Sequence, residues 1–344
     1  MTQSVRRAVL ILTLLGVLAA AFVAPAASAE TATPPAASTV TATAPPTLDP
    51  TRLRRTENYL VLGADVRPGP WLLHTDSMML VAIDKETEQV GVLSIPRDLW
   101  VEIPGWGMDR INKAYFLGDY TKYKGGSPAL AKATVEKTLG VPIHHVVLIK
   151  MAGLAQLVDA LGGITVKLDC PLYEQTPDPK NQNKMLNWSL PAGEVELNGE
   201  DAHKFATYRY LTTDFGRAQR QQQLIWAIRN RAKSLDIVPR IPQLWTALGG
   251  AFKTDLSVLD ALRLARFGLE LDATEVTGAS LAPDVTKPHR TKGGAQVLVI
   301  KDKASLNKRL GEMFTARPLA ELGKVEGECP PAPRGFKPLP APKP

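Results

Sequence analysis

Cysteine is scarce in this chain of 344 residues. Cys170 and Cys329 are the only two, and they are too far apart to have the spacing of a metal site. A metal centre built on cysteine ligands is therefore excluded. In an exported protein these two thiols can form a disulfide, but their spacing does not require one.

Histidine is also rare, and the motifs of several enzyme classes are missing. No G-x-S-x-G, Walker or G-x-G-x-x-G motif stands at a strand-to-helix junction, so nothing indicates a serine hydrolase, a P-loop enzyme or a dinucleotide-binding enzyme. The five histidines have no metal-binding spacing either. They are His74, His144, His145, His203 and His289.

The chain begins with an export segment, "MTQSVRRAVLILTLLGVLAAAFVAPAASAE". Two arginines precede an apolar run from Ala8 to Ala24, and small residues follow at 27–29. This order is typical of a segment that directs export across a membrane. The apolar run is near the lower length limit for spanning a bilayer, so a cleaved signal peptide and a retained anchor both fit, with cleavage slightly favoured.

Composition divides the chain into four segments. From Thr31 to Pro50 the chain is rich in Thr, Ala and Pro and carries almost no charge, which is typical of an extended tether. The C-terminal "CPPAPRGFKPLPAPKP" has the same character, whereas 44% hydrophobic residues overall are enough for a core. We therefore expect the export segment at 1–29, a linker at 30–56, one folded domain at 57–317 and a tail at 318–344.

The charge balance indicates an anionic partner. The formal net charge is +7 and the pI is about 9.3, which suits lipid phosphate, an acidic polymer or nucleic acid. Export makes nucleic acid the least fitting of the three, and we expect no nucleic-acid partner. The alternative is that the excess Lys and Arg side chains only solvate the surface.

Alternating strand and helix patterns predict an α/β fold. Strands are predicted at 58–64, 77–84, 90–95, 144–149 and 164–168. Helices are predicted at 127–140, 152–163, 197–210 and 217–235. Ser127 and Asn198 are the candidate N-caps of the first and third of these helices. Such alternation favours a sheet with helices packed on its faces.

Two carboxylates and an arginine converge at one end of this sheet. The short turn after Asp84 makes the second and third strands an antiparallel hairpin, so Asp76 and Arg97 lie at the same end. If the first strand also pairs antiparallel with the second, Asp65 joins them there. Close carboxylates are tolerated around a divalent cation such as Mg²⁺ or Mn²⁺. Equally, Asp65 and Asp76 can be turn residues that cap backbone groups.

A second cluster of charges lies in "YRYLTTDFGRAQRQQQ". In a helix that begins near Asp214, Arg217 and Gln221 share a face with apolar residues one and two turns further on. Because that face turns inward, the Arg217 guanidinium needs an anionic partner, for which Asp214 is one candidate. Forked guanidinium groups also match phosphate oxygens, so Arg209 and Arg217 suit a pyrophosphate.

Six segments carry a family resemblance, and they stand in the family's order: "LGADVR", "TDSMMLVAID", "LSIPRDLWVEIPGWGMDRINKAY", "LVDALGGITV", "LNGEDAHKFATYRY" and "DFGRAQRQQQ". On these motifs the stretch from Asn58 to Phe314 resembles the LytR-CpsA-Psr family of cell-envelope proteins. The resemblance implies a single three-layer α/β domain, with a central mixed sheet, helices on both faces and an apolar tunnel for a lipid. It also implies a transferase that moves a glycopolymer from a polyprenyl-pyrophosphate carrier to a wall acceptor, commonly peptidoglycan, through a phosphodiester link.

The resemblance assigns roles to the converging charges. Asp65 and Asp76 would hold Mg²⁺, or Mn²⁺ in its place. Arg97, Arg209 and Arg217 would contact the pyrophosphate. Arg97 and Asp76 are thereby candidate catalytic residues, because one neutralises the pyrophosphate and the other holds the metal that polarises it.

Other motif positions carry weaker assignments and two departures. Gln221 and Arg110 stand near the head group. Asp98 is a candidate general base toward the acceptor hydroxyl, although an Asp beside an Arg is more often salt-bridged. Many family members have arginine where Thr207 and His74 stand here, so weaker pyrophosphate binding is expected, with an effect on turnover rate or substrate choice.

Two other functions fit the same residues. A hydrolase would trim polyprenyl pyrophosphates with water in place of the acceptor hydroxyl. A non-catalytic envelope protein would bind lipid-linked glycan in a regulatory role, and its binding would survive the loss of Asp65 and Asp76. In each case we expect the protein at the membrane surface outside the cytoplasm, anchored there or secreted to the wall.

Overall fold

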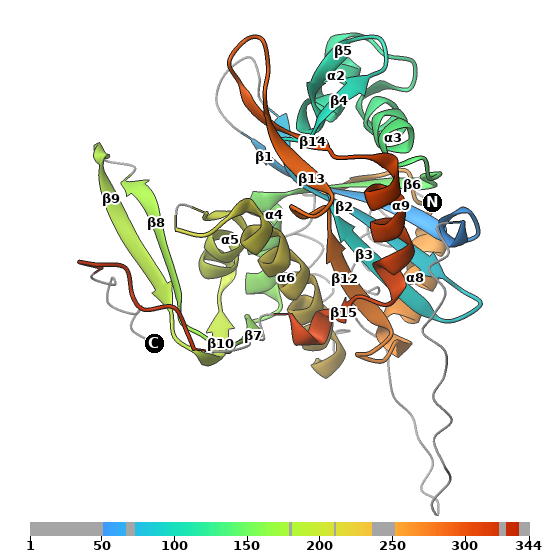
Figure 1. The fold of residues 1–344 in the computed structure, drawn as a ribbon. Helices are drawn as coiled ribbons and strands as arrows, with labels where there is room; N and C mark the ends of the chain where they lie inside the picture. Colours follow the sequence, from blue (N-terminus) through green and yellow to red (C-terminus); the bar gives the residue numbers. More distant parts are fainter. Residues whose placement is uncertain are drawn as a thin grey trace, which may run out of the picture.

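The computed structural model describes residues 51–66, 73–178, 181–209, 211–235, 252–322 and 328–336. The predicted export segment at 1–29 and the linker up to residue 50 lie outside these ranges. Within the described ranges, a mixed sheet of seven strands forms the centre of the molecule (Figure 1). None of the helices in this part of the chain is both long enough and apolar enough to cross a bilayer.

The order of the strands in the central sheet is β11-β6-β1-β2-β3-β12-β15. In that order they comprise Phe252–Thr254, His145–Lys150, Glu57–Val66, Leu73–Asp84, Gln89–Ser94, Val276–Ser280 and Arg317–Pro318. β1, β2 and β3 are antiparallel neighbours, whereas β6 pairs in parallel with β1, and β12 with β3. The predicted hairpins and the α/β class with a mixed sheet are therefore confirmed.

Helices cover both faces of the sheet, because successive residues of the buried strands point to opposite faces and are apolar on both. On one face, Leu60, Leu80 and Leu93 pack in a core with α2 (Ala114–Tyr120), α3 (Gly126–Leu139) and α9 (Lys303–Gly311). On the other, Tyr59 and Val92 face α6 (Asp214–Ser234) and α8 (Val258–Glu270). A third cluster joins α6 to α4 (Met151–Ala160) and α5 (Gly199–Thr207).

In the described part of the chain, four two-stranded ribbons and several short turns surround these layers. The ribbons are β4 (Trp100–Ile103) with β5 (Gly107–Arg110), β7 (Ile164–Leu168) with β10 (Gly193–Leu197), β8 (Leu172–Asp178) with β9 (Asn181–Leu190), and β13 (Thr286–Arg290) with β14 (Gln296–Ile300). The 3-10 turns are η1 (Arg52–Arg54), η2 (Ile111–Lys113), η4 (Glu312–Phe314) and η5 (Leu319–Glu321). The β8–β9 ribbon stands well apart from the sheet (Figure 1).

Several element boundaries differ from the prediction, and three of them concern the site or a predicted N-cap. β2 begins at Leu73, so Asp76 lies inside the strand. The N-cap of α3 is Gly125, at φ 90°, and the prediction of Ser127 was wrong. α5 ends at Thr207. Because of this earlier end, Arg209 lies in a loop before α6. The Asn198 N-cap of α5 is confirmed, since its side chain accepts a hydrogen bond from the backbone of residue 201 at 2.8 Å.

The folded part extends past both predicted limits, 57 and 317. Leu53 and Leu319 are almost completely buried, at 0% and 1% exposure. Further along, Cys329 forms a disulfide with Cys170, directly before β8. The residues on both sides of the predicted domain therefore take part in the fold.

Candidate functional site

Asp76 lies at a β-bulge. The partners of Gly63 and Ala64 on β2 are separated by one extra residue, which is Asp76. A bulge of this kind changes the direction of a side chain, and bulges are common beside active sites. The Asp76 carboxylate accepts a hydrogen bond from Arg97 Nη1 at 2.7 Å, with the two side chains only 16% and 13% exposed. The predicted meeting of β2 with the end of β3 is thus observed.

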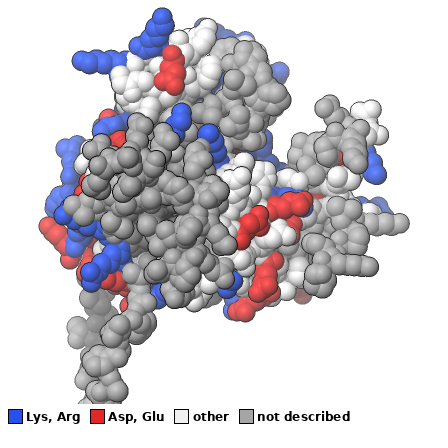
Figure 2. Space-filling model, turned by 180° about the vertical axis from the view of Figure 1, so that it is seen from behind, with Lys and Arg blue, Asp and Glu red and all other residues white. Residues whose placement is uncertain are grey.

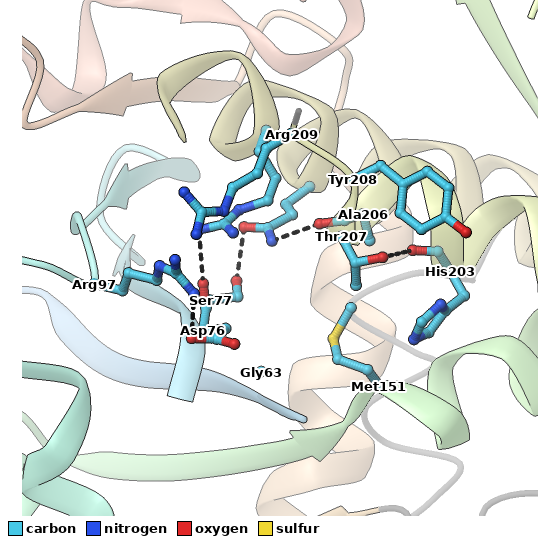
Figure 3. Close-up of a pocket in the computed structure, with 12 residues that line it drawn as sticks. Gly63, Asp76, Ser77, Arg97, Met151, His203, Ala206, Thr207, Tyr208 and Arg209 are labelled. Atoms are coloured by element: carbon cyan, nitrogen blue, oxygen red, sulfur yellow. Dashed lines mark hydrogen bonds and ion pairs between the residues drawn. The ribbon is translucent and has the colours of Figure 1, made fainter. Parts of the chain in front are cut away.

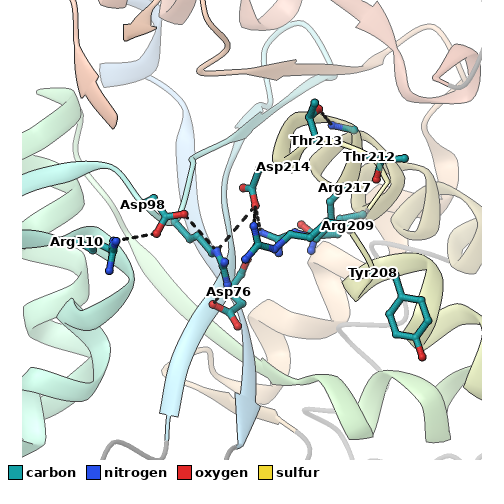
Figure 4. A network of polar contacts seen from close by, with 12 residues as sticks. Asp76, Asp98, Arg110, Tyr208, Arg209, Thr212, Thr213, Asp214 and Arg217 are labelled. Atoms are coloured by element: carbon teal, nitrogen blue, oxygen red, sulfur yellow. Dashed lines mark hydrogen bonds and ion pairs between the residues drawn. The ribbon is translucent and has the colours of Figure 1, made fainter. Parts of the chain in front are cut away.

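Asp214 holds the arginines of the site together. It lies in the first turn of α6, where the helix dipole stabilises a carboxylate. Its Oδ1 is 2.8 Å from Arg217, 3.6 Å from Arg209 and 3.9 Å from Arg97 (Figure 4). Asp76 and Asp98 add two carboxylates and Arg110 adds a fourth guanidinium group, so positive charge is still in excess and favours an anionic ligand.

The sequence allowed Arg217 either to pair with Asp214 or to bind a phosphate group, and its position in the structure fits both. Its side chain is only 6% exposed and pairs with Asp214, while Nη2 donates to the Asp76 carbonyl at 3.1 Å. Nε has no hydrogen-bond partner among the described residues. Burial lowers the pKa of Arg217, Asp214 opposes this shift, and the neighbouring Arg97 adds to it. A further anion beside Arg217 would stabilise its charged form.

Carboxylates surround Arg97. Burial opposes its charge, but Asp76 first, and then Asp98 and Asp214, raise the pKa of Arg97 above its ordinary value. Asp98 Oδ2 lies 3.6 Å from Arg97, and Asp98 Oδ1 lies 3.0 Å from Arg110 Nε. Asp98 is therefore shared between two arginines, as the salt-bridged alternative predicted. Its role as a base stays a prediction.

These charges open onto a cavity of about 680 Å³ (Figure 3). Five of the predicted site residues line it: Asp76, Arg97, Arg209, Arg217 and Gln221. Gln221 is fixed in place, because its Nε2 donates to the Ala206 carbonyl at 2.9 Å and its Oε1 accepts from the Ser77 hydroxyl at 2.9 Å. Arg209 is 41% exposed, so a ligand in the cavity can reach it. Asp98 and Arg110 adjoin this lining through Arg97.

Thr207, one of the two positions at which many family members have arginine, also lines the cavity. So does His203, to which the sequence assigned no role. Thr207 lines the wall and donates its hydroxyl to the His203 carbonyl at 2.7 Å, so this position carries no charge. His203 lines the same wall, one helical turn before Thr207. Because residues four apart share a face of a helix, the sequence could have placed His203 beside Thr207. His74 stands on β2, opposite Asp65 in the register.

An apolar cavity of about 140 Å³ lies beside the polar one, between the sheet and helices α6 and α8. Along β1, Val61 lines the apolar cavity and Gly63 the polar one. Along α6, Ile225 lines the apolar cavity, and Gln221, one turn earlier, lines the polar one. The arginines therefore stand at one end of an apolar slot, which is the combination of surfaces that an amphipathic ligand requires.

The metal prediction falls partly outside the described side chains. The Asp65 backbone pairs with His74, beside Asp76 along β2, but its side chain is not among those described. Within the part of the chain that the structure describes, no group of three or more His, Cys, Asp or Glu residues is placed to hold a metal ion. Mg²⁺ usually takes one or two carboxylates and completes its shell with water and phosphate, so an Asp65–Asp76 pair has the right chemistry.

Together, the fold and the site define a three-layer α/β protein that offers an anion-binding cavity next to an apolar one. A family model described as the LytR_cpsA_psr family matches residues 24–309. The chain belongs to the LytR-CpsA-Psr family, as its motifs predicted.

Curated relatives match over part of their length. The polyisoprenyl-teichoic acid–peptidoglycan teichoic acid transferase TagU of Oceanobacillus iheyensis is 35% identical over 203 residues, which are 58% of this chain and 59% of that protein. The regulatory protein MsrR of Staphylococcus aureus is 30% identical over 200 residues, 57% of this chain and 55% of that protein. The chain thus spans less than two thirds of the length of these relatives.

Solved structures share the fold. The crystal structure of TagV from B. subtilis gives a TM-score of 0.59 at 23% identity, over 77% of this chain and 99% of that chain. TagT bound to LIIa-WTA gives 0.57 at 24% identity, over 78% of this chain and 93% of that chain. At these identities the likeness concerns the architecture.

Proposed function

We propose that this protein transfers a glycopolymer from a polyprenyl-pyrophosphate carrier to a cell-wall acceptor such as peptidoglycan, with formation of a phosphodiester link. The observation that carries the proposal is the position of Arg97, Arg209 and Arg217 at the end of an apolar cavity. A lipid pyrophosphate needs both parts, because its oxygens require cations and its tail requires apolar surface. The TagU relatives are named as transferases of a polyisoprenyl-linked polymer to peptidoglycan, which agrees with this donor and acceptor.

In this proposal, side chains of the protein bind the negatively charged pyrophosphate and accept the proton of the acceptor hydroxyl. An acceptor hydroxyl oxygen forms a bond to the phosphorus that bears the glycan, and the bond from that phosphorus to the bridging oxygen breaks, so that polyprenyl phosphate leaves. Arg97, Arg209 and Arg217 bind the pyrophosphate oxygens and stabilise the charge that develops on them. Asp98 takes the proton of the attacking hydroxyl, and Gln221 borders the head group.

Asp65 and Asp76 would hold the Mg²⁺ or Mn²⁺ ion, which supplies Lewis-acid polarisation of the pyrophosphate when it is bound. Arg97 already neutralises Asp76 in this structure, through the contact at 2.7 Å. Arg97 therefore positions the Asp76 carboxylate and remains next to the pyrophosphate.

We place the activity outside the cytoplasm, at the outer face of the cytoplasmic membrane or in the wall. The export segment supports this location, and so does the Cys170–Cys329 disulfide, since disulfides persist in oxidising compartments. A lipid-linked donor also resides in a membrane, which brings the protein to the membrane surface.

Single-turnover transfer from a purified lipid-pyrophosphate glycan to peptidoglycan fragments tests the proposal, with Mg²⁺ and with a chelator. Arg97→Ala and Asp76→Ala are each expected to lower the rate of linkage by about 10²–10³-fold, because each removes a charge next to the reacting phosphorus. Arg263→Ala is the matched control. That arginine is 70% exposed on α8, away from the cavity lining, and its loss is expected to leave the rate unchanged.

The other functions predict different products. Release of free phosphorylated glycan without linkage would make the protein a hydrolase. Equal lipid binding by the wild type and both variants, with no turnover, would make it a non-catalytic binder. Linkage that requires the metal and is lost in both variants supports the transferase.

A further inference from the structure

The β13–β14 ribbon is an exposed basic segment that the site does not use. From Val285 to Lys301 the sequence contains no Asp or Glu. Five basic side chains of this segment are exposed: Lys287, His289, Arg290, Lys292 and, at its end, Lys301. Among the described residues, no carboxylate forms an ion pair with Lys287, Arg290 or Lys292. On the face seen from behind, Asp and Glu side chains lie among the Lys and Arg side chains of the described residues (Figure 2).

The ribbon is fixed to the segment that carries the site. Leu298 N donates to the Asp98 carbonyl at 3.0 Å, and Leu99 forms a parallel bridge with Leu298. Arg110 Nη2 donates to the Gln296 carbonyl at 3.0 Å. Leu298 also packs against the main core. β14 is therefore held beside the Asp98–Leu99 segment at its middle and near its turn, while the cations of the ribbon face solvent.

The apolar cavity, the polar cavity and the ribbon follow one another along the direction of β1. Along β1 the apolar cavity comes first, at Tyr59 and Val61, and the polar cavity follows at Gly63. The ribbon extends beyond the same end of the central sheet (Figure 1). A lipid tail in the apolar cavity and a pyrophosphate on the arginines would therefore direct the attached polymer toward this end.

We propose that the β13–β14 ribbon binds the polyanionic chain of the polymer that is being transferred, a glycopolymer with phosphate or carboxylate groups. This inference rests on the proposed function. The cations fit repeated negative charges. The alternative partner is an anionic membrane. The ribbon fits it less well, because Val297 is buried, Leu298 packs against the main core, and none of the exposed large hydrophobic side chains lies in the described ribbon.

The test measures binding of a fluorescent poly(glycerol phosphate) oligomer, with neutral dextran as the uncharged probe, at low and at high salt. The triple variant Lys287→Ser, Arg290→Ser, Lys292→Ser is expected to bind the oligomer about tenfold more weakly at low salt, with a smaller salt dependence. The matched control is Lys167→Ser, Lys184→Ser, Lys253→Ser, which removes the same charge from exposed positions elsewhere. It is expected to bind like the wild type.

The outcomes separate this inference from the proposed function. Transfer from a donor with a short uncharged glycan is expected to be unchanged in the ribbon variant, and transfer from a polyanionic donor is expected to show a raised KM. Arg97→Ala is expected to lose transfer but keep oligomer binding. Equal oligomer binding by the two triple variants would overturn the ribbon proposal. The proposal would also be overturned if the ribbon variant lost binding only to phosphatidylglycerol vesicles, with phosphatidylcholine vesicles as the comparison. That result would make the partner an anionic membrane.

Discussion

A buried ion pair between Glu174 and Arg220 holds the loop that carries Arg209 in place. Glu174 on β8 is completely buried, and its carboxylate lies 3.5 Å from Arg220 Nη2. The same carboxylate accepts hydrogen bonds from Leu211 N and from the Thr212 hydroxyl, both in the loop between α5 and α6. Burial lowers the pKa of Arg220 to about 10, and Glu174 opposes that shift. Each charge therefore depends on the other, and the loop depends on both.

Glu174→Gln is expected to reduce the free energy of unfolding by about 3–5 kcal/mol, because it leaves the Arg220 charge buried without its partner. Urea unfolding at neutral pH measures the change. Glu200→Gln is the matched control, since that side chain is 77% exposed on α5 and the same chemical change there is expected to cost under about 0.5 kcal/mol. Equal losses in the two variants would contradict the role given to the buried pair.

Single residues show where sequence patterns stop being informative. The hairpin geometry correctly placed Asp76 beside Arg97, because strand pairing fixes neighbours across a turn. The helical face correctly turned Arg217 inward. No periodicity predicts that Asp214 also approaches Arg97, since that contact joins residues 117 positions apart in sequence, through tertiary packing. Glu174 is a similar case, because its partners are 37 to 46 positions away.

Among the elements, the strands β1, β2, β3, β6 and β7 were predictable, whereas β12 of the central sheet and the β8–β9 and β13–β14 ribbons were not. The predicted strands carry apolar runs, and helices such as α5 begin at a side-chain N-cap, so both leave a clear pattern. The ribbons β8–β9 and β13–β14 expose much of both faces, so their sequences lack the alternation of apolar and polar residues that marks a half-buried strand. The bulge at Asp76 was also missed, because one extra residue in a strand has no compositional signal.

The turn between β2 and β3 has an acid-sensitive anchor. Burial disfavours the Asp84 charge, but the side chain of Arg52 and the backbone of Thr87 and Glu86 donate hydrogen bonds that lower the pKa of Asp84 below 3.8. A carboxyl whose pKa is lower in the folded state contributes its full stabilisation above the unfolded pKa. That stabilisation is lost as the pH falls through the folded pKa.

Asp84→Asn is therefore expected to reduce the free energy of unfolding by about 1 kcal/mol at neutral pH. The difference from the wild type is expected to shrink as the pH falls below 3.8. Denaturant unfolding over a pH series checks this. The exposed Glu86→Gln variant in the same turn is the control, and its difference from the wild type is expected to stay small throughout. An Asp84→Asn difference that is independent of pH would refute the argument.

On the scale of the whole molecule, the C-terminal residues are part of the fold although their composition predicts a tether. Leu319 and Leu322 are buried against the sheet. Beyond them, the Phe336 ring lies 5.1 Å from the Tyr173 ring of β8, centroid to centroid. Proline-rich sequence has no periodicity from which such docking can be predicted. The pairing of two cysteines 159 positions apart is equally invisible in their spacing.

The disulfide is expected to stabilise the whole domain more than it affects chemistry. Cys170 and Cys329 enclose a long loop, and closing such a loop restricts the unfolded chain. The Cys170→Ser, Cys329→Ser variant is expected to lose about 2–5 kcal/mol in urea unfolding, and the wild type with a reductant is expected to match it. Because neither cysteine belongs to the described cavity lining, the single-turnover rate below the unfolding transition is expected to stay near wild type. A variant that unfolds at the wild-type midpoint would show that the docked tail, held by contacts such as the one with Tyr173, is sufficient without the covalent link.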